Sequence, residues 1–135
     1  MFLYVTLGTN DVKRAKRFYD AALGVLGMVC HHEDATELGY GPNPPPTEGR
    51  TCRLWVTTPH LGYPATWGNG TMVALPASTR QQVRDFHAAA IAAGGTDDGA
   101  PGLRPYHLTF YSCYVRDPDG NKLCFVCHAP EELTR

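Results

Sequence analysis

Apolar residues follow a strand period and then a helix period, and this succession occurs twice along the chain. The β-prone runs cover residues 2–7 and 71–75. Strand-like segments follow at 28–33, 37–40 and 51–57, and again near 96, at 107–115 and at 122–127. The intervening segments carry apolar residues at helical spacing: Val12, Ala15, Tyr19, Ala22 and Leu26 in the first, and Val83, Phe86, Ala90 and Ala93 in the second. The predicted order is βαβββ followed by βαβββ.

Capping and turn residues mark where several of these elements begin. Asn10 or Asp11 is expected to cap the first helix. Ser78 and Gln81 form an S-x-x-Q pattern, which predicts a capping box at the start of the second. The run D-P-D-G-N at 117–121 predicts a tight turn, and hence a hairpin of the last two strands.

The two halves of the chain resemble each other in sequence. Residues 4–27 align without gaps with residues 72–95, at a constant offset of 72 minus 4, or 68. The identical pairs are Val5 and Val73, Leu7 and Leu75, Phe18 and Phe86, Ala21 and Ala89, Ala22 and Ala90, and Gly27 and Gly95. We therefore predict a duplicated α+β module within one domain. Its expected parts are module 1 (1–62, with a proline-rich surface loop at 41–49), a linker (63–69), module 2 (70–128) and a C-terminal tail (129–135).

Composition narrows the classes of partner. The 135 residues carry a formal net charge of −1 and no basic run, which argues against nucleic acid. No segment approaches the roughly 20 apolar residues of a membrane helix. The first residues are typical of a strand rather than of a signal peptide, so the five cysteines are expected to be thiols in a reducing cytoplasm.

Three segments carry a resemblance to a known family. They are YVTLGTND at 4–11, leading to FYD at 18–20; GNGT at 68–71; and YVRDPDGN at 114–121. With the duplicated βαβββ order, the chain resembles the vicinal oxygen chelate superfamily, which includes glyoxalase I, bleomycin-resistance proteins and extradiol dioxygenases. The resemblance implies that each module curls its strands into half a cup of curved mixed sheet. It also implies that two half-cups enclose a cavity and that the protein forms a homodimer.

The resemblance also gives four positions where metal-using relatives place His, Glu or Gln. They fall on Tyr4, Val56, Met72 and Cys124, and a one-residue error at Val56 would substitute Trp55 or Thr57. Divalent cations prefer imidazole and carboxylate, with thiolate for softer metals, so Cys124 alone is a good donor. We expect no metal and no other cofactor. A divalent metal is expected only if this assignment of ligands is wrong.

The run C-F-V-C-H at 124–128 matches the C-x-x-C-H pattern of covalent haem attachment. Haem attachment needs an exported chain and an open segment, whereas this run lies in a predicted strand. Residues three apart in a strand face opposite sides, which also argues against a metal or redox clip. We therefore interpret Cys124 and Cys127 as inert strand thiols.

The loop at 99–107 is the best candidate for a ligand site. In relatives with a similar G-L-R-P segment this region borders the cavity, which points to Arg104, Tyr106 and His107. Arginine offers a two-pronged grip on a carboxylate or phosphate, while Tyr106 and His107 are candidates for acid–base catalysis. The remaining candidate substrate-binding residues are Tyr111, Cys113, Cys124 and Trp55.

Two classes of function remain open from the sequence. The missing metal ligands favour metal-free binding of a small ligand, as in bleomycin-resistance proteins. The alternative is a glyoxalase-type lyase or isomerase, or a dioxygenase-like enzyme, that acts on a small oxygenated substrate. In both cases the expected partners are a small molecule and a second copy of the chain, with no nucleic acid and no membrane.

Overall fold

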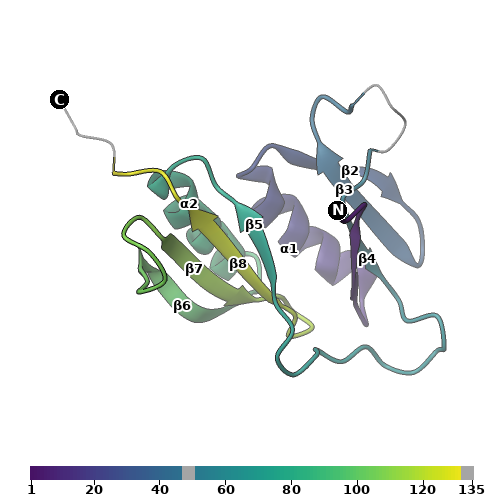
Figure 1. The fold of residues 1–135 in the computed structure, drawn as a ribbon. Helices are drawn as coiled ribbons and strands as arrows, with labels where there is room; N and C mark the ends of the chain where they lie inside the picture. The colour runs from purple at the N-terminus through teal and green to yellow at the C-terminus, as the bar shows by residue number, and fades with distance from the viewer. Residues whose placement is uncertain (47–50, 132–135) are drawn as a thin grey trace.

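The computed structural model describes residues 1–46 and 51–131 (Figure 1). Two βαβββ modules follow one another, so the predicted α+β duplication is confirmed. The first module consists of β1 (Val5–Gly8), α1 (Val12–Gly24), β2 (Met28–Glu33), β3 (Glu37–Pro42) and β4 (Leu54–Thr57). The second consists of β5 (Val73–Pro76), α2 (Arg80–Ala92), β6 (Thr96–Leu103), β7 (Tyr111–Arg116) and β8 (Lys122–Cys127).

Each module forms its own four-stranded mixed sheet with the same topology. The strand orders are β1-β4-β3-β2 and β5-β8-β7-β6. The outer β1 and β5 each run parallel to the last strand of their module, and the remaining neighbours are antiparallel. The two halves therefore match in topology as well as in sequence.

Several strands differ in extent from the sequence-based expectation: β4 begins at Leu54 rather than at 51, and β7 begins at Tyr111 rather than at 107. β6 is an eight-residue strand, although its glycines and proline predict only a short piece near residue 96. Its register to β7 shifts twice, around Gly99, so the irregularities accommodate residues that weaken a regular strand. The proline-rich stretch contributes its first residues, Gly41 and Pro42, to β3, and residues 47–50 lie outside the described part, as do 132–135 of the tail.

Both helices begin at a residue whose side chain caps the first turn, and for α2 this residue lies one position later than the sequence predicts. Asp11 caps α1, where its carboxylate accepts from the Arg14 amide at 3.0 Å. The cap of α2 is Thr79, not Ser78, because the Thr79 hydroxyl accepts from the Gln82 amide at 3.0 Å. The Gln82 side chain in turn accepts from the Ser78 amide at 2.7 Å, so the reciprocal pair lies one residue later than the sequence pattern predicts.

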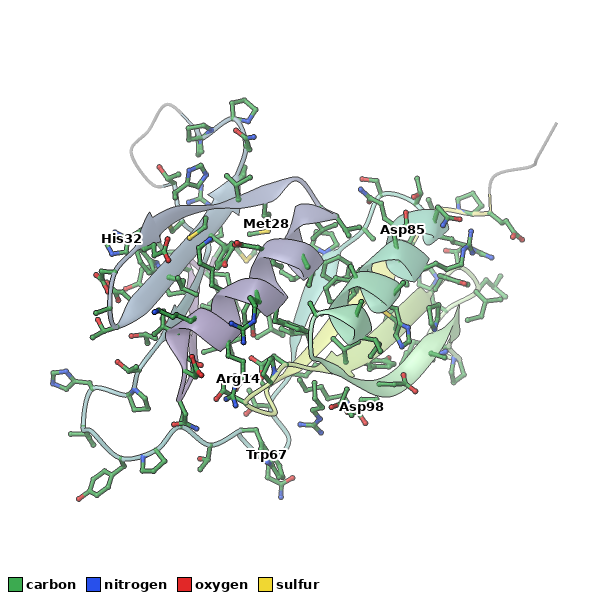
Figure 2. All side chains as sticks on the ribbon, turned by 180° about the vertical axis from the view of Figure 1, so that it is seen from behind. Arg14, Met28, His32, Trp67, Asp85 and Asp98 are labelled. Carbon is green, nitrogen blue, oxygen red and sulfur yellow. The ribbon has the colours of Figure 1, made fainter. Side chains whose placement is uncertain are left out.

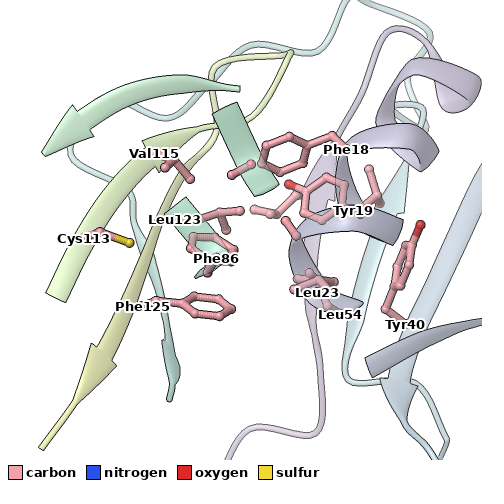
Figure 3. Close-up of a cluster of buried hydrophobic side chains, with 14 of the residues drawn as sticks. Phe18, Tyr19, Leu23, Tyr40, Leu54, Phe86, Cys113, Val115, Leu123 and Phe125 are labelled. Atoms are coloured by element: carbon pink, nitrogen blue, oxygen red, sulfur yellow. The ribbon is translucent and has the colours of Figure 1, made fainter. Parts of the chain in front are cut away.

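The core lies between the two sheets, where the helices pack against one face of each sheet (Figure 3). Phe86 of α2 stacks on Phe125 of β8 with ring centroids 3.4 Å apart. Phe18 and Tyr19 of α1 meet edge to face at 4.9 Å, and α1 also packs against α2. Helical packing therefore joins the modules into one body. Among the described residues, no strand of one sheet contacts a strand of the other.

The β7–β8 turn also joins the modules. The Asp119 carboxylate accepts hydrogen bonds from the Thr9 hydroxyl (2.6 Å), the Asn10 amide (2.9 Å) and the Arg14 guanidinium (2.8 Å). Figure 2 shows Arg14 extending from α1 toward this turn. The turn predicted from the D-P-D-G-N run thus also contacts the junction between β1 and α1.

A buried polar network lies behind the turn. The Tyr19 hydroxyl donates to Asp117 at 2.5 Å, and the Asn121 amide group donates both to Asp117 at 2.8 Å and to the Gly8 carbonyl at 2.9 Å. Burial raises the pKa of the Asp117 carboxyl, while the bonds from Tyr19 and Asn121 offset part of that rise. The network is therefore satisfied at its centre, as a buried polar group between modules requires.

Within the described part of the chain, neither helix is long and apolar enough to cross a membrane.

Candidate functional site

Each sheet has one face against the helices and one open face. On β8, Leu123, Phe125 and Cys127 belong to the core, so Cys124 and Val126 point to the open side. Cross-strand partners share a face, which places Tyr114 with Cys124 and Ser112 with Val126. By the same alternation, the open face of the second sheet carries Arg104, Phe110, Ser112, Tyr114, Lys122, Cys124, Val126 and His128. We call this surface the module 2 face.

Strand pairing corrects one of the four positions expected for metal ligands. Val5 pairs with Leu54 in the first sheet and Val73 with Leu123 in the second, separations of 49 and 50 residues. The second module therefore has one extra residue between its outer and last strands, and the equivalent of Cys124 is Trp55. Val56 is fully buried in the core and does not face the open side. The one-residue error considered in the sequence is the real arrangement.

The four equivalent positions on the open faces are thus Tyr4, Trp55, Met72 and Cys124. Tyr4 and Met72 are 53% and 44% exposed, directly before the outer strand of each sheet, so they are free to contact another molecule. A phenol, an indole, a thioether and a thiol do not form a set of donors for a hard or borderline divalent cation. The residues present therefore do not fit the metal that the fold implies.

Cys124 is also a poor thiolate. Burial raises the pKa of its thiol to about 11, and the hydrogen bond from Tyr114 and the charges of Arg104 and Lys122 offset only part of the rise. At neutral pH the group is a protonated thiol, which neither ligates a metal nor attacks an electrophile well. Cys127 points to the core side of the same strand, so the C-x-x-C-H run cannot bring its two thiols to one ligand.

Two of the proposed substrate-binding residues, Tyr111 and Cys113, lie on the helix side of β7. The Cys113 thiol faces α2, where it donates to the Val83 carbonyl at 3.6 Å, and burial raises its pKa to about 12. Arg80 of α2 covers the Tyr111 ring at 5.0 Å. The sheet therefore separates both residues from Arg104 and from Cys124. The residues on the module 2 face are instead Ser112 and Tyr114, which the sequence-based site does not include.

Arg104 lies on the module 2 face, beside Tyr114. Its guanidinium carbon lies 5.3 Å from the centre of the Tyr114 ring, and the Lys122 ammonium lies 5.2 Å from the same ring. Nη2 of Arg104 donates to the Ala100 carbonyl at 2.6 Å. These contacts hold one guanidinium and one ammonium group against a single aromatic ring.

Asp98 balances part of the positive charge near Lys122 on this face. It accepts from Arg116 at 2.9 Å and lies 3.3 Å from Lys122. Slight burial alone would raise the pKa of Asp98, but Lys122 and Arg116 outweigh it and lower the pKa. Asp98 is therefore an ionised partner for these two cations.

Tyr106 and His107 lie at the rim of the module 2 face, in the loop between β6 and β7. Nδ1 of His107 accepts from the Thr109 amide at 3.1 Å, which leaves Nε2 to carry the proton and to donate to Nδ1 of His128 at 3.3 Å. Tyr106 and His107 both meet the Phe110 ring edge to face. The structure therefore brings Arg104, Tyr106, His107 and Cys124 to one side of one sheet.

Trp55 belongs to the other module. It lies across Gly39 of the first sheet, where an added Cβ would come within 2.8 Å of the indole, and its ring lies 5.4 Å from that of His32. Among the described residues, no strand of the first sheet, which carries Trp55, contacts a strand of the second sheet, which forms the module 2 face. Trp55 and Arg104 are therefore not neighbours within one chain.

One group of side chains among the described residues has the types and proximity for a metal: His32, Asp34 and Glu37, with ligand atoms within 4.8 Å of one another. Asp34 closes the β2–β3 hairpin by accepting from the amides of Thr36 and Glu37 at 2.9 Å, and its other oxygen meets His32 at 2.9 Å. The Thr36 amide and His32 lower the pKa of Asp34. These hairpin bonds account for the cluster without an ion.

On the module 2 face, Ser112, Cys124 and Val126 are buried, whereas Arg104 and Tyr114 are partly exposed. Three shallow depressions in the described part of the chain have volumes of about 360 to 430 Å³. They are lined by the linker, by the β7–β8 turn and by the helix ends. Arg104, Tyr114 and Cys124 do not line these three depressions.

Sequence reasoning places Lys122 on the strand face of Cys124 but leaves it, with Ser112 and Tyr114, out of the candidate site. The alternation of side chains along β8 is the signal that identifies them. Because Phe125 packs on α2, every even-numbered residue of that strand faces the open side, and the hairpin register then selects the even-numbered residues of β7.

Comparison with known proteins agrees with this architecture. The family model described as the glyoxalase/bleomycin resistance protein/dioxygenase superfamily matches residues 2–125. A glyoxalase/bleomycin resistance protein from Albidiferax ferrireducens T118 is 39% identical, with a TM-score of 0.82 over 96% of this chain and 99% of that one. Lactoylglutathione lyase from Agrobacterium tumefaciens is 18% identical, with a TM-score of 0.60 over 94% and 92% of the two chains, and that likeness shows the fold alone. Among curated protein sequences, the comparison gives no match.

The chain therefore belongs to the glyoxalase/bleomycin resistance protein/dioxygenase superfamily.

Proposed function

We propose that the protein binds a small molecule without a metal ion, on the module 2 face. One observation carries this proposal. The four positions where the family places metal ligands hold Tyr4, Trp55, Met72 and Cys124, and none of them supplies an imidazole or a carboxylate. With the thiol of Cys124 protonated at neutral pH, the centre has no anionic donor to attract a divalent cation.

Isothermal titration of the purified chain with Ni²⁺, Zn²⁺ and Mn²⁺ tests the metal-free state. The His32 cluster is the described group able to give a false positive, so the same titrations are made with His32→Ala. We expect either no binding in the wild type or weak binding that His32→Ala removes. Stoichiometric binding that persists in His32→Ala contradicts the proposal and favours the enzymatic alternative, a glyoxalase-type lyase or isomerase.

A second copy of the chain is the proposed cover for the open faces. Among the described residues, no strand that carries Trp55 contacts a strand of the module 2 face, and Tyr4 and Met72 are exposed. The charges of the two surfaces are complementary. Acidic side chains gather at the β2–β3 hairpin beside Trp55, whereas the module 2 face carries Arg104 and Lys122. A homodimer in which module 1 of one copy covers module 2 of the other buries both surfaces.

Light scattering after size exclusion tests this arrangement. We expect a dimer for the wild type and a monomer for Met72→Glu, which places a charge directly before the outer strand of the second sheet. Ile91→Glu is a matched control on the helical side, where the side chain is 37% exposed, and we expect it to remain dimeric. A monomeric wild type at a concentration of about 100 μM would contradict the dimer, and the metal titration is read independently of it.

A further inference from the structure

The orientation of Arg104 indicates what kind of chemical group the module 2 face binds. Nη2 donates to the Ala100 carbonyl at 2.6 Å and Nη1 donates to the Leu103 carbonyl at 3.4 Å. Tyr114 lies against the guanidinium at 5.3 Å. A guanidinium has five N–H donors, so these contacts fix its orientation while leaving donors unused.

Two glycines of β6 leave the room that this guanidinium occupies. A Cβ at Gly102 would lie 3.0 Å from Nη1 of Arg104. A Cβ at Gly99 would lie 3.4 Å from Nη2 and 2.7 Å from Cδ2 of Tyr114. Any other residue at either position would therefore crowd or displace the guanidinium. The local sequence fits a surface on which an arginine lies flat along the strand.

The charge of Arg104 is not balanced within the described residues. Arg14 pairs with Asp119 at 2.8 Å, and Arg116 and Lys122 share Asp98. For Arg104, no carboxylate in the described part of the chain lies within ion-pair distance. Lys122 lies against the same ring of Tyr114, and its charge is partly balanced by Asp98. An arginine held in one place without an anionic partner is poised to receive one.

A second, independent feature of the same face is an unpartnered hydroxyl. Ser112 is fully buried, and its Oγ has no hydrogen-bond partner among the described groups. Ser112 is paired with Gly102, the residue over which Nη1 of Arg104 lies, so its side chain points to the same side of the sheet. Buried hydroxyl groups in folded proteins nearly always have a partner, and a ligand oxygen would supply it.

We infer that Arg104 and Ser112 form an anchor for an oxyanion, a carboxylate or a phosphate group of the small ligand. The inference rests on the proposed function, because it names the ligand chemistry of the same face. Arg104 supplies charge and a two-pronged set of donors, Lys122 adds attraction, and Ser112 supplies one neutral hydrogen bond.

The experiment follows the Nε–Hε resonance of Arg104 in the full chain by NMR. Sodium acetate and inorganic phosphate are the two probes, titrated at constant ionic strength against chloride. We expect a saturable shift with a millimolar dissociation constant for at least one probe. Stronger binding of acetate assigns a carboxylate to the site, and stronger binding of phosphate assigns a phosphate. A shift that is absent, or that does not saturate with either probe, overturns the inference.

Variants separate an anchor from general charge attraction. Arg104→Gln is expected to weaken binding about tenfold or more, read from the backbone amides of Tyr114 and Lys122. Gly102→Ala keeps every charge but crowds Nη1, and it is expected to weaken binding severalfold. Ser112→Ala is expected to weaken it by a smaller factor.

Two matched controls should bind the probes as the wild type does. Arg84→Gln removes one positive charge from the helix side of the second sheet, where Arg84 contacts Tyr111. Gly24→Ala adds a methyl group where no atom lies within 4 Å. Equal losses in Arg104→Gln and Arg84→Gln would overturn the inference. Thermal melts confirm that each variant is folded. Metal binding is measured in a separate titration. A chain that binds neither metal nor anion therefore contradicts the anchor but not the metal-free state, whereas a chain that binds metal contradicts the proposed function.

Discussion

At the scale of single residues, environment decides the chemistry of the candidate site more than residue type does. Cys124 occupies a position where metal-using relatives have a ligand, yet burial raises the pKa of its thiol to about 11. Arg104 is only partly exposed, yet two glycines and an aromatic ring fix its guanidinium. The same side chains in a solvated loop would have neither property.

The thiol of Cys124 is expected to react slowly with iodoacetamide at pH 7.5 because its thiolate fraction is very small. The rate should rise about tenfold per pH unit until the pH approaches the pKa of about 11. Peptide mapping by mass spectrometry measures it, with the guanidinium-unfolded chain as control. Complete modification of native Cys124 within minutes at neutral pH would contradict a buried, protonated thiol.

The raised pKa of the Cys124 thiol also predicts how the free energy of unfolding depends on pH. The pKa of Cys124 in the folded protein lies above the ordinary value of 9.0, so the folded state holds the proton more tightly than the unfolded chain does. The favourable contribution is complete below pH 9 and is lost as the pH rises from about 9 through 11. The free energy of unfolding should therefore fall over this range, and fall less in Cys124→Ala.

Ser112→Ala is expected to leave the free energy of unfolding unchanged or raise it by about 1 kcal/mol in the absence of oxyanions, because it removes an unpaired buried hydroxyl. Urea denaturation measures the change. Thr9→Ala is the contrasting control, since the Thr9 hydroxyl donates to Asp119 at 2.6 Å, and it should be destabilising. A loss of more than about 1 kcal/mol in Ser112→Ala would show that its hydroxyl has a partner within the protein.

At the scale of elements, the hydrophobic pattern predicts both helices, most strands and the duplication. It does not predict the register between them. The single extra residue in the second module moves the equivalent position from Val56 to Trp55, and no pattern in the first module signals it. On β7, both alternating sets contain aromatic and small residues, so the sequence leaves open whether Tyr111 or Tyr114 faces the ligand side. The packing of Phe125 on Phe86 decides it.

The β7–β8 turn is the element whose disruption should cost the fold most per residue. Asp119→Ala removes three hydrogen bonds between the modules, one of them to the Arg14 guanidinium, and is expected to lower the free energy of unfolding by about 2–3 kcal/mol. Arg14→Ala and the double variant complete a thermodynamic cycle. Because Asp119 and Arg14 lie in one network, the losses in the free energy of unfolding of the two single variants should add up to more than the loss in the double variant. Additive effects would contradict the assignment of the turn as a shared contact.

At the scale of the whole molecule, the duplication creates two similar sheets that have acquired different chemistry. The first carries Trp55 and an acidic hairpin, and the second carries Arg104 and Lys122. The modules associate through α1, α2 and the β7–β8 turn, and no strand of one sheet contacts a strand of the other in the described part of the chain. The sequence alone predicts the lack of metal donors, since it depends on residue type at four strand positions. It also predicts Arg104 as a grip for a carboxylate or phosphate, but not Ser112 or the space above Gly99 and Gly102, which exists only once the strands are paired.

The central claim is that this member of the superfamily holds its ligand without a metal. Native mass spectrometry of the chain, purified without chelators from cells supplemented with iron, manganese, nickel and zinc, tests it most directly. We expect the mass of the metal-free polypeptide, with metal below about 0.1 equivalent per chain, since a single poor donor gives no stable site. One equivalent of any of these metals, retained in the His32→Ala variant, would contradict the account.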